Sequence, residues 1–197
     1  MNPKLLTHPN IPKPLHGMNP RTLLGQEWWD IHRREAYAKE GFHCWACGIH
    51  KHDAEYHQWL EGHESYDIDY DTGRVELQEI VALCHSCHNF IHSGRLLILF
   101  VEGEVSEKKF RDVYLRGFKI LRQSGLKPFW GTAQLWLRFQ GKDDFEIDEI
   151  MKEKKLYPER EETAEWNEWH LVLEGKKYYS RFKNYEAWAK HYAKGGQ

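Results

Sequence analysis

The pattern of hydrophobic and polar positions along the chain predicts three amphipathic helices. The first runs from Gln26 to Lys39, where good helix formers continue without glycine or proline until Gly41, a favoured helix cap. A longer helix should cover Glu107 to Gln123, because hydrophobic residues recur there at the spacing of a helix that faces a core. Its hydrophobic stripe consists of Phe110, Val113, Tyr114, Gly117, Phe118 and Leu121. A final helix should follow Asn184, a good N-terminal cap, with four residues on one face: Tyr185, Trp188, Ala189 and Tyr192.

A different pattern, with short hydrophobic runs between turn residues, predicts a β-hairpin and a short helix after it. Residues 56–70 and 74–83 fit two strands, and Asp71-Thr72-Gly73 fits the turn that joins them. A short helix should follow from His85 to His92 and end at Gly94. This order of strand, strand and helix places several histidines close to one another.

The remaining stretches are marked by proline and by charge. Five of the seven prolines lie in the first twenty residues, which predicts an extended arm, either a loose tail or a strap packed on the domain. Residues 141–165 carry ten acidic and five basic side chains and fit an exposed acidic segment or linker. The stretch from Trp166 onward fits a small hairpin with Glu174-Gly175 at its turn.

These elements predict an α+β protein in three parts. Residues 1–25 form the proline-rich arm, and residues 26–103 form a domain built from the first helix, the hairpin and the short helix. Residues 104–197 form an α+β extension with the basic helix, the acidic segment, the small hairpin and the last helix. A chain of 197 residues is long enough for one such core with an extension.

Composition narrows the class of protein. The formal net charge is −2 with neutral histidines, so any nucleic-acid binding must come from a local patch or a bound metal. The longest uninterrupted apolar run, residues 96–101, is far shorter than the ~20 residues of a membrane-spanning helix. No apolar segment follows a basic stretch near the N-terminus, as a secretory signal would require. We therefore expect a soluble, cytoplasmic protein without a membrane partner.

The four cysteines predict a structural zinc site. They form two Cys-x-x-Cys pairs, and the chain has no other cysteine: Cys44, Cys47, Cys84 and Cys87. Two such turns can converge into a tetrahedral cage of thiolates for Zn²⁺. A disulfide framework is disfavoured without a secretion signal, and nothing else in the chain resembles a thioredoxin-like redox protein. Four thiolates leave no open coordination position, so this zinc would be structural rather than catalytic.

The histidines are concentrated around these cysteines. Eight of the thirteen lie within residues 43–92. His88 and His92 are four residues apart, so on a helix they project from one face and could share a metal ion. His63 lies on the preceding hairpin, and a strand–strand–helix unit can bring it to the other two. Three more are interpreted as ordinary surface or core residues, the last of them near enough to serve as a reserve ligand: His50, His52 and His57.

Residues 42–94 resemble the HNH endonucleases of the ββα-metal fold, in the branch whose fold is stabilised by a four-cysteine zinc. The resemblance rests on Cys-x2-Cys-Gly, on a hairpin with a histidine-centred motif, and on Leu-Cys-x2-Cys-His-x3-His. It implies a zinc-stabilised ββα-metal core, with the N-terminal helix and arm before it and the α+β extension after it. It also implies hydrolysis of phosphodiester bonds with a single divalent metal ion.

The resemblance assigns roles to particular residues. The family's two ligands on the helix fall on His88 and His92, and its metal ligand and general base on the first strand fall on His63 and Glu64. The asparagine that orients the base falls on Glu79. Two positions therefore depart from the family pattern. Either Glu64 acts as the base in place of an imidazole, or His63 is the base and one ligand is lost.

Phosphodiester hydrolysis explains why these residue types would be needed. A neutral histidine, with an ordinary pKa near 6.5, can take a proton from water at physiological pH. A carboxylate such as Glu64 is a weaker base unless burial raises its pKa. Imidazole ligands suit Mn²⁺, Ni²⁺ or Zn²⁺ better than Mg²⁺. The predicted cofactors are a structural Zn²⁺ and one catalytic divalent metal, namely Mg²⁺, Mn²⁺, Ni²⁺ or Zn²⁺.

The substrate would be held by basic side chains outside the metal sites. The candidate nucleic-acid-binding residues are Arg33, Arg34, Arg95, Lys108, Arg111, Arg116 and Lys119. The expected partner is nucleic acid, with DNA as the expected substrate, and residues 104–197 are the expected docking region for a protein partner. Two alternatives stay open: a catalytically inactive zinc-stabilised module that binds nucleic acid or protein, and a nuclease subunit of a phage or bacterial defence complex.

Overall fold

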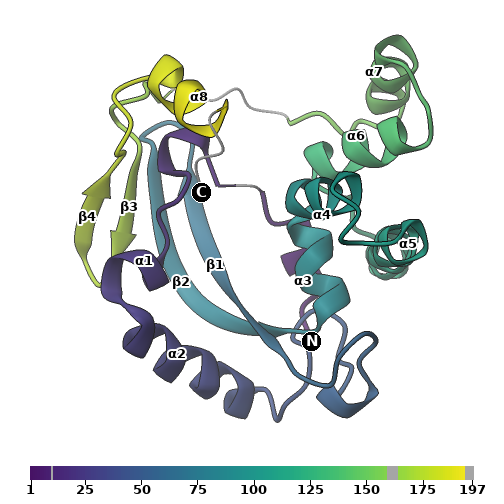
Figure 1. Cartoon of the computed structure of the whole chain (residues 1–197), viewed down its shortest axis with the longest axis horizontal. Helices are drawn as coiled ribbons and strands as arrows, with labels where there is room; N and C mark the ends of the chain where they lie inside the picture. Colours follow the sequence, from purple (N-terminus) through teal and green to yellow (C-terminus); the bar gives the residue numbers. More distant parts are fainter. Residues whose placement is uncertain (10, 159–163, 194–197) are drawn as a thin grey trace. The chain divides into compact units, whose positions relative to one another are not determined.

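The computed structural model describes residues 1–9, 11–158 and 164–193, whose elements are labelled in Figure 1. The chain divides into two compact units. Unit 1 comprises residues 1–10, 36–63 and 82–159, and unit 2 comprises residues 11–35, 64–81 and 160–197. The sequence predicts boundaries at residues 25/26 and 103/104 between parts that could each fold on their own. That division is a different property from the two compact units, and it stays a prediction. The protein is a mixed α+β protein, as its sequence pattern predicts.

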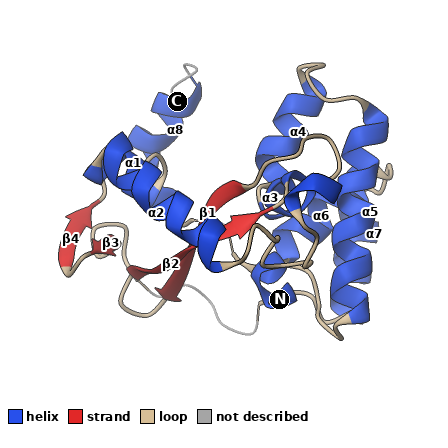
Figure 2. Ribbon diagram, turned by 90° about the horizontal axis from the view of Figure 1, so that it is seen from below, coloured by secondary structure: helices blue, strands red, loops and turns tan. Residues whose placement is uncertain are grey.

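The central feature is the hairpin of β1 (Glu61–Asp69) and β2 (Arg74–Leu83), which leads directly into α3 (His85–Ile91). In Figure 2 its strands are red and the helices are blue. The turn lies where it is predicted: the Asp69 carboxylate accepts hydrogen bonds from two backbone amides of the turn, and Gly73 has a φ of +67°. A side chain at Gly73 would be strained there.

Two predicted boundaries around this hairpin are wrong. The first strand begins at Glu61 rather than at residue 56, because Tyr56 has a φ of +75°, which a strand does not tolerate. The helix after the hairpin does not end at Gly94. It breaks at His92, and α4 (Ser93–Val101) starts at once with Gly94 inside it. The apolar run that follows Gly94 is therefore helical.

The core of unit 1 is formed by helices packed beside α3. Helix α5 (Glu107–Gln123) has the predicted bounds, and its predicted stripe is buried except for the half-buried Phe118. The Phe90 ring of α3 lies against Gly117 of α5 so closely that even a methyl group there would overlap it. This close approach fixes α3 on α5.

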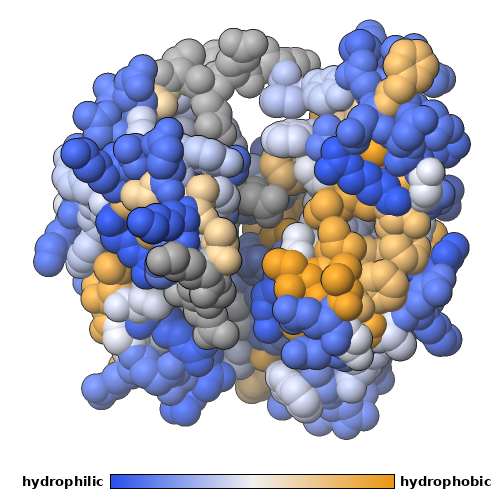
Figure 3. Space-filling view, turned by 45° about the horizontal axis from the view of Figure 1, so that its top comes forward, coloured by the Kyte–Doolittle hydropathy of each residue, from blue (hydrophilic) through white to orange (hydrophobic). Residues whose placement is uncertain are grey.

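Two further helices complete unit 1. They are α6 (Trp130–Phe139) and α7 (Asp144–Glu153), and α7 lies in the stretch predicted to be an exposed acidic segment. Asp143 caps α7, and Ile147 and Met151 are buried against α6. The acidic residues are thus the solvent face of an amphipathic helix rather than a linker over this part. On the face shown in Figure 3, hydrophobic side chains gather over the helical part of unit 1.

Unit 2 is built on the sheet, whose strand order is β1-β2-β3-β4. Strand β3 (His170–Leu173) pairs parallel to β2 and antiparallel to β4 (Lys176–Tyr179). The predicted turn at Glu174-Gly175 is confirmed, and both residues have positive φ, as a type I′ hairpin turn requires. Helix α8 (Tyr185–Ala193) follows, with the Asn184 side chain accepting a hydrogen bond from the Ala187 amide as the predicted cap.

The helix α2 (Gln26–Lys39) has the predicted bounds, but the segment before it is not extended. It forms the short helical turns η1 (Pro3–Thr7) and η2 (Lys13–Leu15) and the helix α1 (Pro20–Leu24). Each has a proline in its first turn, where the missing N–H costs nothing. Buried leucines hold the segment down, so it is a packed strap over its described residues.

Candidate metal centre

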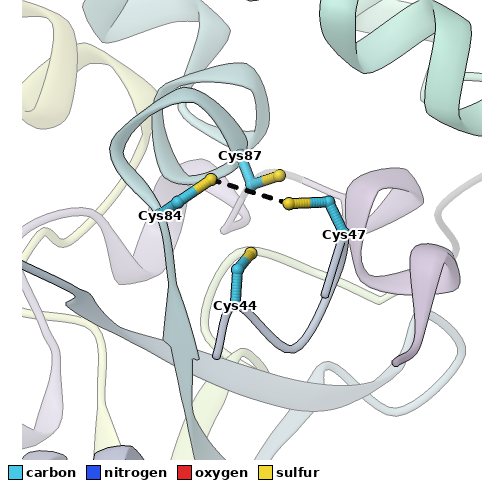
Figure 4. A group of neighbouring side chains, drawn as sticks. All are labelled: Cys44, Cys47, Cys84 and Cys87. Carbon is cyan, nitrogen blue, oxygen red and sulfur yellow. Dashed lines mark hydrogen bonds between the residues drawn. The ribbon is translucent and has the colours of Figure 1, made fainter. Parts of the chain in front are cut away.

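The four cysteines lie together and direct their sulfurs toward a common centre (Figure 4). Cys44 and Cys47 come from the turn after α2, Cys84 caps α3, and Cys87 lies in its first turn. All four sulfurs are within 4.8 Å of one another, and the Cys47 and Cys84 Sγ atoms are 3.8 Å apart. Sulfurs about 2.3 Å from a tetrahedral Zn²⁺ would be separated by about the same distance. The cluster can therefore hold a zinc ion.

The first cysteine turn has a backbone that suits this role. The Gly48 amide donates to the Cys44 carbonyl at 2.7 Å, and the Cys44 amide donates to the Ile49 carbonyl at 2.8 Å. Gly48 has a φ of +74°, which a glycine adopts without strain. The glycine of Cys-x2-Cys-Gly thus closes a tight turn that presents two thiols to one side.

Arg116 of α5 contributes positive charge to the cysteine cluster. Its guanidinium donates to Cys47 Sγ at 3.8 Å and forms an ion pair with Glu55 at 3.3 Å. Hydrogen bonding from Cys44 lowers the pKa of Cys47, which favours a thiolate. Four thiolates around Zn²⁺ carry a net negative charge, so a nearby guanidinium stabilises the site. The predicted nucleic-acid role of Arg116 thus competes with a role at the cysteines.

Three histidines form a second cluster beside the cysteines. His63 comes from β1, His88 from α3, and His92 from the break between α3 and α4. One ring nitrogen of each lies within 4.8 Å of the others, and His63 Nδ1 is 3.2 Å from His92 Nε2. The sequence predicts this convergence from the spacing of two helix positions and the hairpin. Such a set of imidazoles could hold one divalent ion.

The environment of this cluster favours the neutral form of two of its imidazoles, those of His63 and His92. His63 is only 3% exposed, and burial lowers its pKa well below the ordinary value. Burial, together with the nearby His88 and Arg95, lowers the pKa of His92 to about 3. His63 Nε2 is buried and has no hydrogen-bond partner among the described residues. Neutral imidazoles offer the lone pairs that a metal ion needs, and protonated ones do not.

A further group of metal-ligating side chains adjoins the three-histidine cluster. It consists of His57, Glu61 and His85, whose ligand atoms are also within 4.8 Å of one another. The other carboxylate oxygen of Glu61 is 2.5 Å from His88 Nδ1. Burial raises the pKa of Glu61, but its contacts with His85 and His88 outweigh this and lower it below its usual range. Glu61 is thus a carboxylate shared between two groups of histidines.

The sequence contained signals for part of this group that the predictions did not use. Glu61 is two residues before His63, so on a strand both side chains lie on the same face. His85 is three residues before His88 and seven before His92, a spacing that places all three on one helix face. The sequence indicates His57 only as a reserve ligand, because a single histidine outside a clear motif is most often an ordinary surface or core residue. One more imidazole had no sequence signal: the His8 ring lies 5.8 Å from the His63 ring.

The two glutamates at which this chain departs from the family pattern are not part of these clusters. Glu64 follows His63 in β1, so its side chain leaves the strand on the opposite face. Glu79 lies in β2, outside every metal-ligating group found among the described residues. The proposed roles of Glu64 and Glu79 therefore rest on the sequence resemblance alone.

The candidate nucleic-acid-binding residues differ in whether they form ion pairs with acidic side chains and in how exposed they are. Three of them form ion pairs with acidic neighbours on their own helices: Arg33 with Asp30 at 2.7 Å, Lys108 with Asp112 at 2.5 Å, and Arg111 with Glu107 at 3.3 Å. Arg34, Arg95 and Lys119 are exposed. Arg95 follows the three-histidine cluster by three residues, and its charge contributes to the low pKa of His92. Of the predicted substrate contacts in unit 1, Arg95 is thus nearest in sequence to the cluster.

Comparison with known proteins adds no family assignment. No protein-family model, curated protein or solved structure matches the chain. Among the described residues, no helix is both long and apolar enough to cross a membrane. The function must therefore be argued from the residues and the geometry of the clusters.

Proposed function

We propose that the protein is a metal-dependent endonuclease of the HNH type, which hydrolyses phosphodiester bonds of nucleic acid, with DNA as the expected substrate. The observation that carries the proposal is the three-histidine cluster. One histidine comes from a β-hairpin, one from the helix that follows it directly and one from the residue that ends this helix, which is the order of a ββα-metal site. The cysteine cluster at the start of the same helix supports it, since it would hold that helix to the preceding turn.

His63, His88 and His92 would hold the divalent ion through neutral ring nitrogens. When bound, such an ion contacts a phosphate oxygen and stabilises the charge that develops on the leaving oxygen. Three protein ligands leave positions for water and phosphate. The carboxylate of Glu61 next to His88 would fix the orientation of that ring, as carboxylates beside metal-bound histidines commonly do.

With His63 as a metal ligand, the proton acceptor for the attacking water has two candidates. Glu64 holds the family position but leaves β1 on the face opposite His63. His8 lies beside His63, and its Nδ1 is 2.9 Å from the Pro9 carbonyl, which fixes that nitrogen as the N–H donor. Nε2 is then the basic nitrogen of His8. If His8 is the base, His8→Ala should lower cleavage about 100-fold or more without releasing the ion.

The test is cleavage of supercoiled plasmid by protein whose labile ions have been removed, with Mg²⁺, Mn²⁺ or Ni²⁺ added back. We expect nicking with at least one ion, and a loss of about 100-fold or more in His63→Ala and His92→Ala. His52→Ala is the matched control, because His52 is exposed and outside the clusters. No nicking with any ion, or equal nicking by wild type and His63→Ala, would contradict the proposal.

A second candidate function is a module that binds nucleic acid without cutting it. The observation that favours it is the absence of an imidazole at position 64, together with the opposite facing of Glu64 and His63. Fluorescence anisotropy with labelled duplex and single-stranded DNA distinguishes the two functions. Binding that needs no divalent ion and leaves the DNA intact with every ion would favour the module.

A further inference from the structure

In the group formed by His57, Glu61 and His85, three polar atoms are all within hydrogen-bond distance of one another. His57 Nε2 is 2.7 Å from His85 Nδ1 and 3.0 Å from Glu61 Oε1, and His85 Nδ1 is 2.7 Å from the same Glu61 oxygen. Three polar atoms from a loop, a strand and a helix thus form a nearly regular triangle. All three residues belong to unit 1.

Hydrogen bonds cannot satisfy all three sides of this triangle. The carboxylate oxygen can only accept. If both ring nitrogens carry protons and donate to Glu61, two N–H groups face each other across 2.7 Å. If only one carries a proton, the other nitrogen presents a lone pair to the oxygen or to its neighbour. With Glu61 ionised, every protonation state of the two rings therefore leaves one repulsive contact, which a cation at the centre would remove.

A cation satisfies the three atoms together. Ligand atoms about 2.1 Å from an ion and at right angles to each other are separated by about 3 Å, close to the sides of this triangle. We propose that His57, Glu61 and His85 form a second divalent-cation site beside the three-histidine cluster. With two imidazoles and one carboxylate on one face, the site suits a first-row transition ion such as Mn²⁺, Fe²⁺ or Zn²⁺.

Glu61 connects this site to its neighbour. One carboxylate oxygen belongs to the triangle, and the other lies 2.5 Å from His88 Nδ1, whose ring belongs to the three-histidine cluster. The occupant of one site therefore affects the ligands of the other through a single side chain. An ion bound at the triangle would thus change the charge that Glu61 presents to the His88 ring, and through that ring the affinity of the neighbouring cluster.

The second site is open on one side. The side chains of His57, His85 and Glu61 are 12%, 17% and 23% exposed, so the triangle is reachable from solvent. The His57 ring is stacked on Trp59, with ring centroids 3.6 Å apart and an angle of 2° between the planes. This stacking holds the ligand nitrogen in place. Three ligands on one face leave the other coordination positions to water or to an anionic oxygen.

The test counts Mn²⁺ ions, because Mn²⁺ prefers oxygen and nitrogen ligands and does not compete well for the cysteine cluster. Full-length protein that retains one Zn²⁺ is titrated with Mn²⁺ and followed by electron paramagnetic resonance. We expect two bound Mn²⁺ per wild-type chain. We expect one bound Mn²⁺ in His57→Ala and in His85→Ala, and two in the control His52→Ala.

A further variant tests the shared carboxylate. Glu61→Gln keeps the shape of the side chain and removes its charge, so it should lose the second ion and weaken the remaining one about 10- to 100-fold. Retained zinc and an unchanged circular dichroism spectrum show that each variant is folded. An unchanged affinity of the remaining ion in Glu61→Gln would overturn the shared role of Glu61.

The outcomes separate this site from the proposed function. One Mn²⁺ in wild type that is lost in His92→Ala but kept in His57→Ala and His85→Ala would overturn the second site and leave the nuclease proposal standing. Two Mn²⁺ that persist in both His57→Ala and His85→Ala would also overturn it. No bound Mn²⁺ at all would overturn both. Because the readout is the number of ions, the result does not depend on cleavage activity.

Discussion

The cysteine cluster and the histidine clusters share one short helix but are different kinds of site. Cys84 and Cys87 lie three positions apart at the start of α3, and His85 and His88 follow each of them by one position. One residue is a rotation of about 100° on a helix, so the sulfurs and the imidazoles leave α3 on different sides. The same segment can thus serve a closed thiolate site on one side and open imidazole sites on the other.

The two sites differ in how the protein surrounds their ligand atoms. Three of the four cysteines are buried, and Arg116 supplies charge to the half-buried fourth, so the chain encloses most of this site. The histidine clusters instead include a buried ring nitrogen, His63 Nε2, that has no hydrogen-bond partner among the described residues, and a carboxylate shared by two groups. A closed site stabilises the fold, whereas open positions are needed to bind a substrate. Substitutions on the two sides should therefore have different effects.

The largest effect is expected for Cys84→Ser. Structural zinc contributes about 10 kcal/mol or more in small zinc domains, which is comparable with the whole stability of a typical protein. Removing one thiolate should release the zinc and unfold unit 1, including α3. The measurements are zinc content and the helical circular dichroism signal.

The neighbouring substitution His88→Ala is the matched control on the other side of α3. It should keep the zinc and the helical signal and lose the divalent ion of the three-histidine cluster. If His88→Ala unfolded to the same extent as Cys84→Ser, the cysteine cluster could not be distinguished from the histidine clusters as the site that stabilises the fold. A folded Cys84→Ser protein that retains zinc would remove this distinction as well.

A smaller effect is expected from moving α3 as a whole. In Gly117→Ala the added methyl group would overlap the Phe90 ring, so α3 must shift on α5. Overpacking of this kind costs about 1–3 kcal/mol of unfolding free energy. Because α3 carries both cysteine and histidine ligands, the affinity of the cysteine cluster for zinc and the affinity of the histidine clusters for divalent ions should fall together. Chemical denaturation and ion titration measure the two effects.

Gly94→Ala is the control for this substitution. Gly94 is also a helical glycine, but a methyl group there meets no atom within 4 Å. Replacing it should raise the unfolding free energy by about 0.5–1 kcal/mol, because alanine loses less conformational freedom in a helix. If both variants were equally stable, the packing of Phe90 on Gly117 would not be what positions α3.

The cysteine site and the histidine sites also differ in how far the sequence could predict them. Each cysteine pair is local, so spacing alone indicates two turns that can face one ion. The three-histidine cluster required one further step, the pairing of β1 with β2, and the hairpin turn at Asp71-Thr72-Gly73 supplied it. The strand, turn and helix patterns were thus enough for residues whose positions follow from regular structure.

The remaining ligands lie where regular patterns end. His57 precedes β1 in a loop that begins with the positive φ of Tyr56, and a pattern of alternating residues cannot reveal such a turn. His8 reaches His63 from the strap, across more than fifty residues of sequence, through tertiary packing alone. Helix α7 was missed for another reason, since its many charges outnumber the few buried residues that pack it.

The smallest predicted effect concerns a half-buried histidine outside the clusters, His16 of unit 2. Trp188 Nε1–H donates to its Nδ1 at 3.2 Å, and its Nε2 is 3.0 Å from the Ile11 carbonyl, so the neutral ring has a partner on each nitrogen. Burial lowers its pKa below 6.5. Above this pH neither the folded nor the unfolded state binds the proton, and the full stability is present. As the pH falls through 6.5, the unfolded state takes up a proton that the folded state excludes, so stability decreases.

Between pH 7 and pH 5, His16 should account for a decrease of up to about 1 kcal/mol, since its partial exposure to solvent reduces the effect. The measurement is the unfolding free energy of unit 2, followed by the fluorescence of its tryptophans, in wild type and His16→Gln at both pH values. The variant should show the smaller decrease, and added Mn²⁺ should not change the difference, because both nitrogens of His16 are occupied by protein groups. A difference that disappears with Mn²⁺ would mean that His16 also binds the ion. The contrast between imidazoles satisfied by the chain and imidazoles left for a metal would then fail.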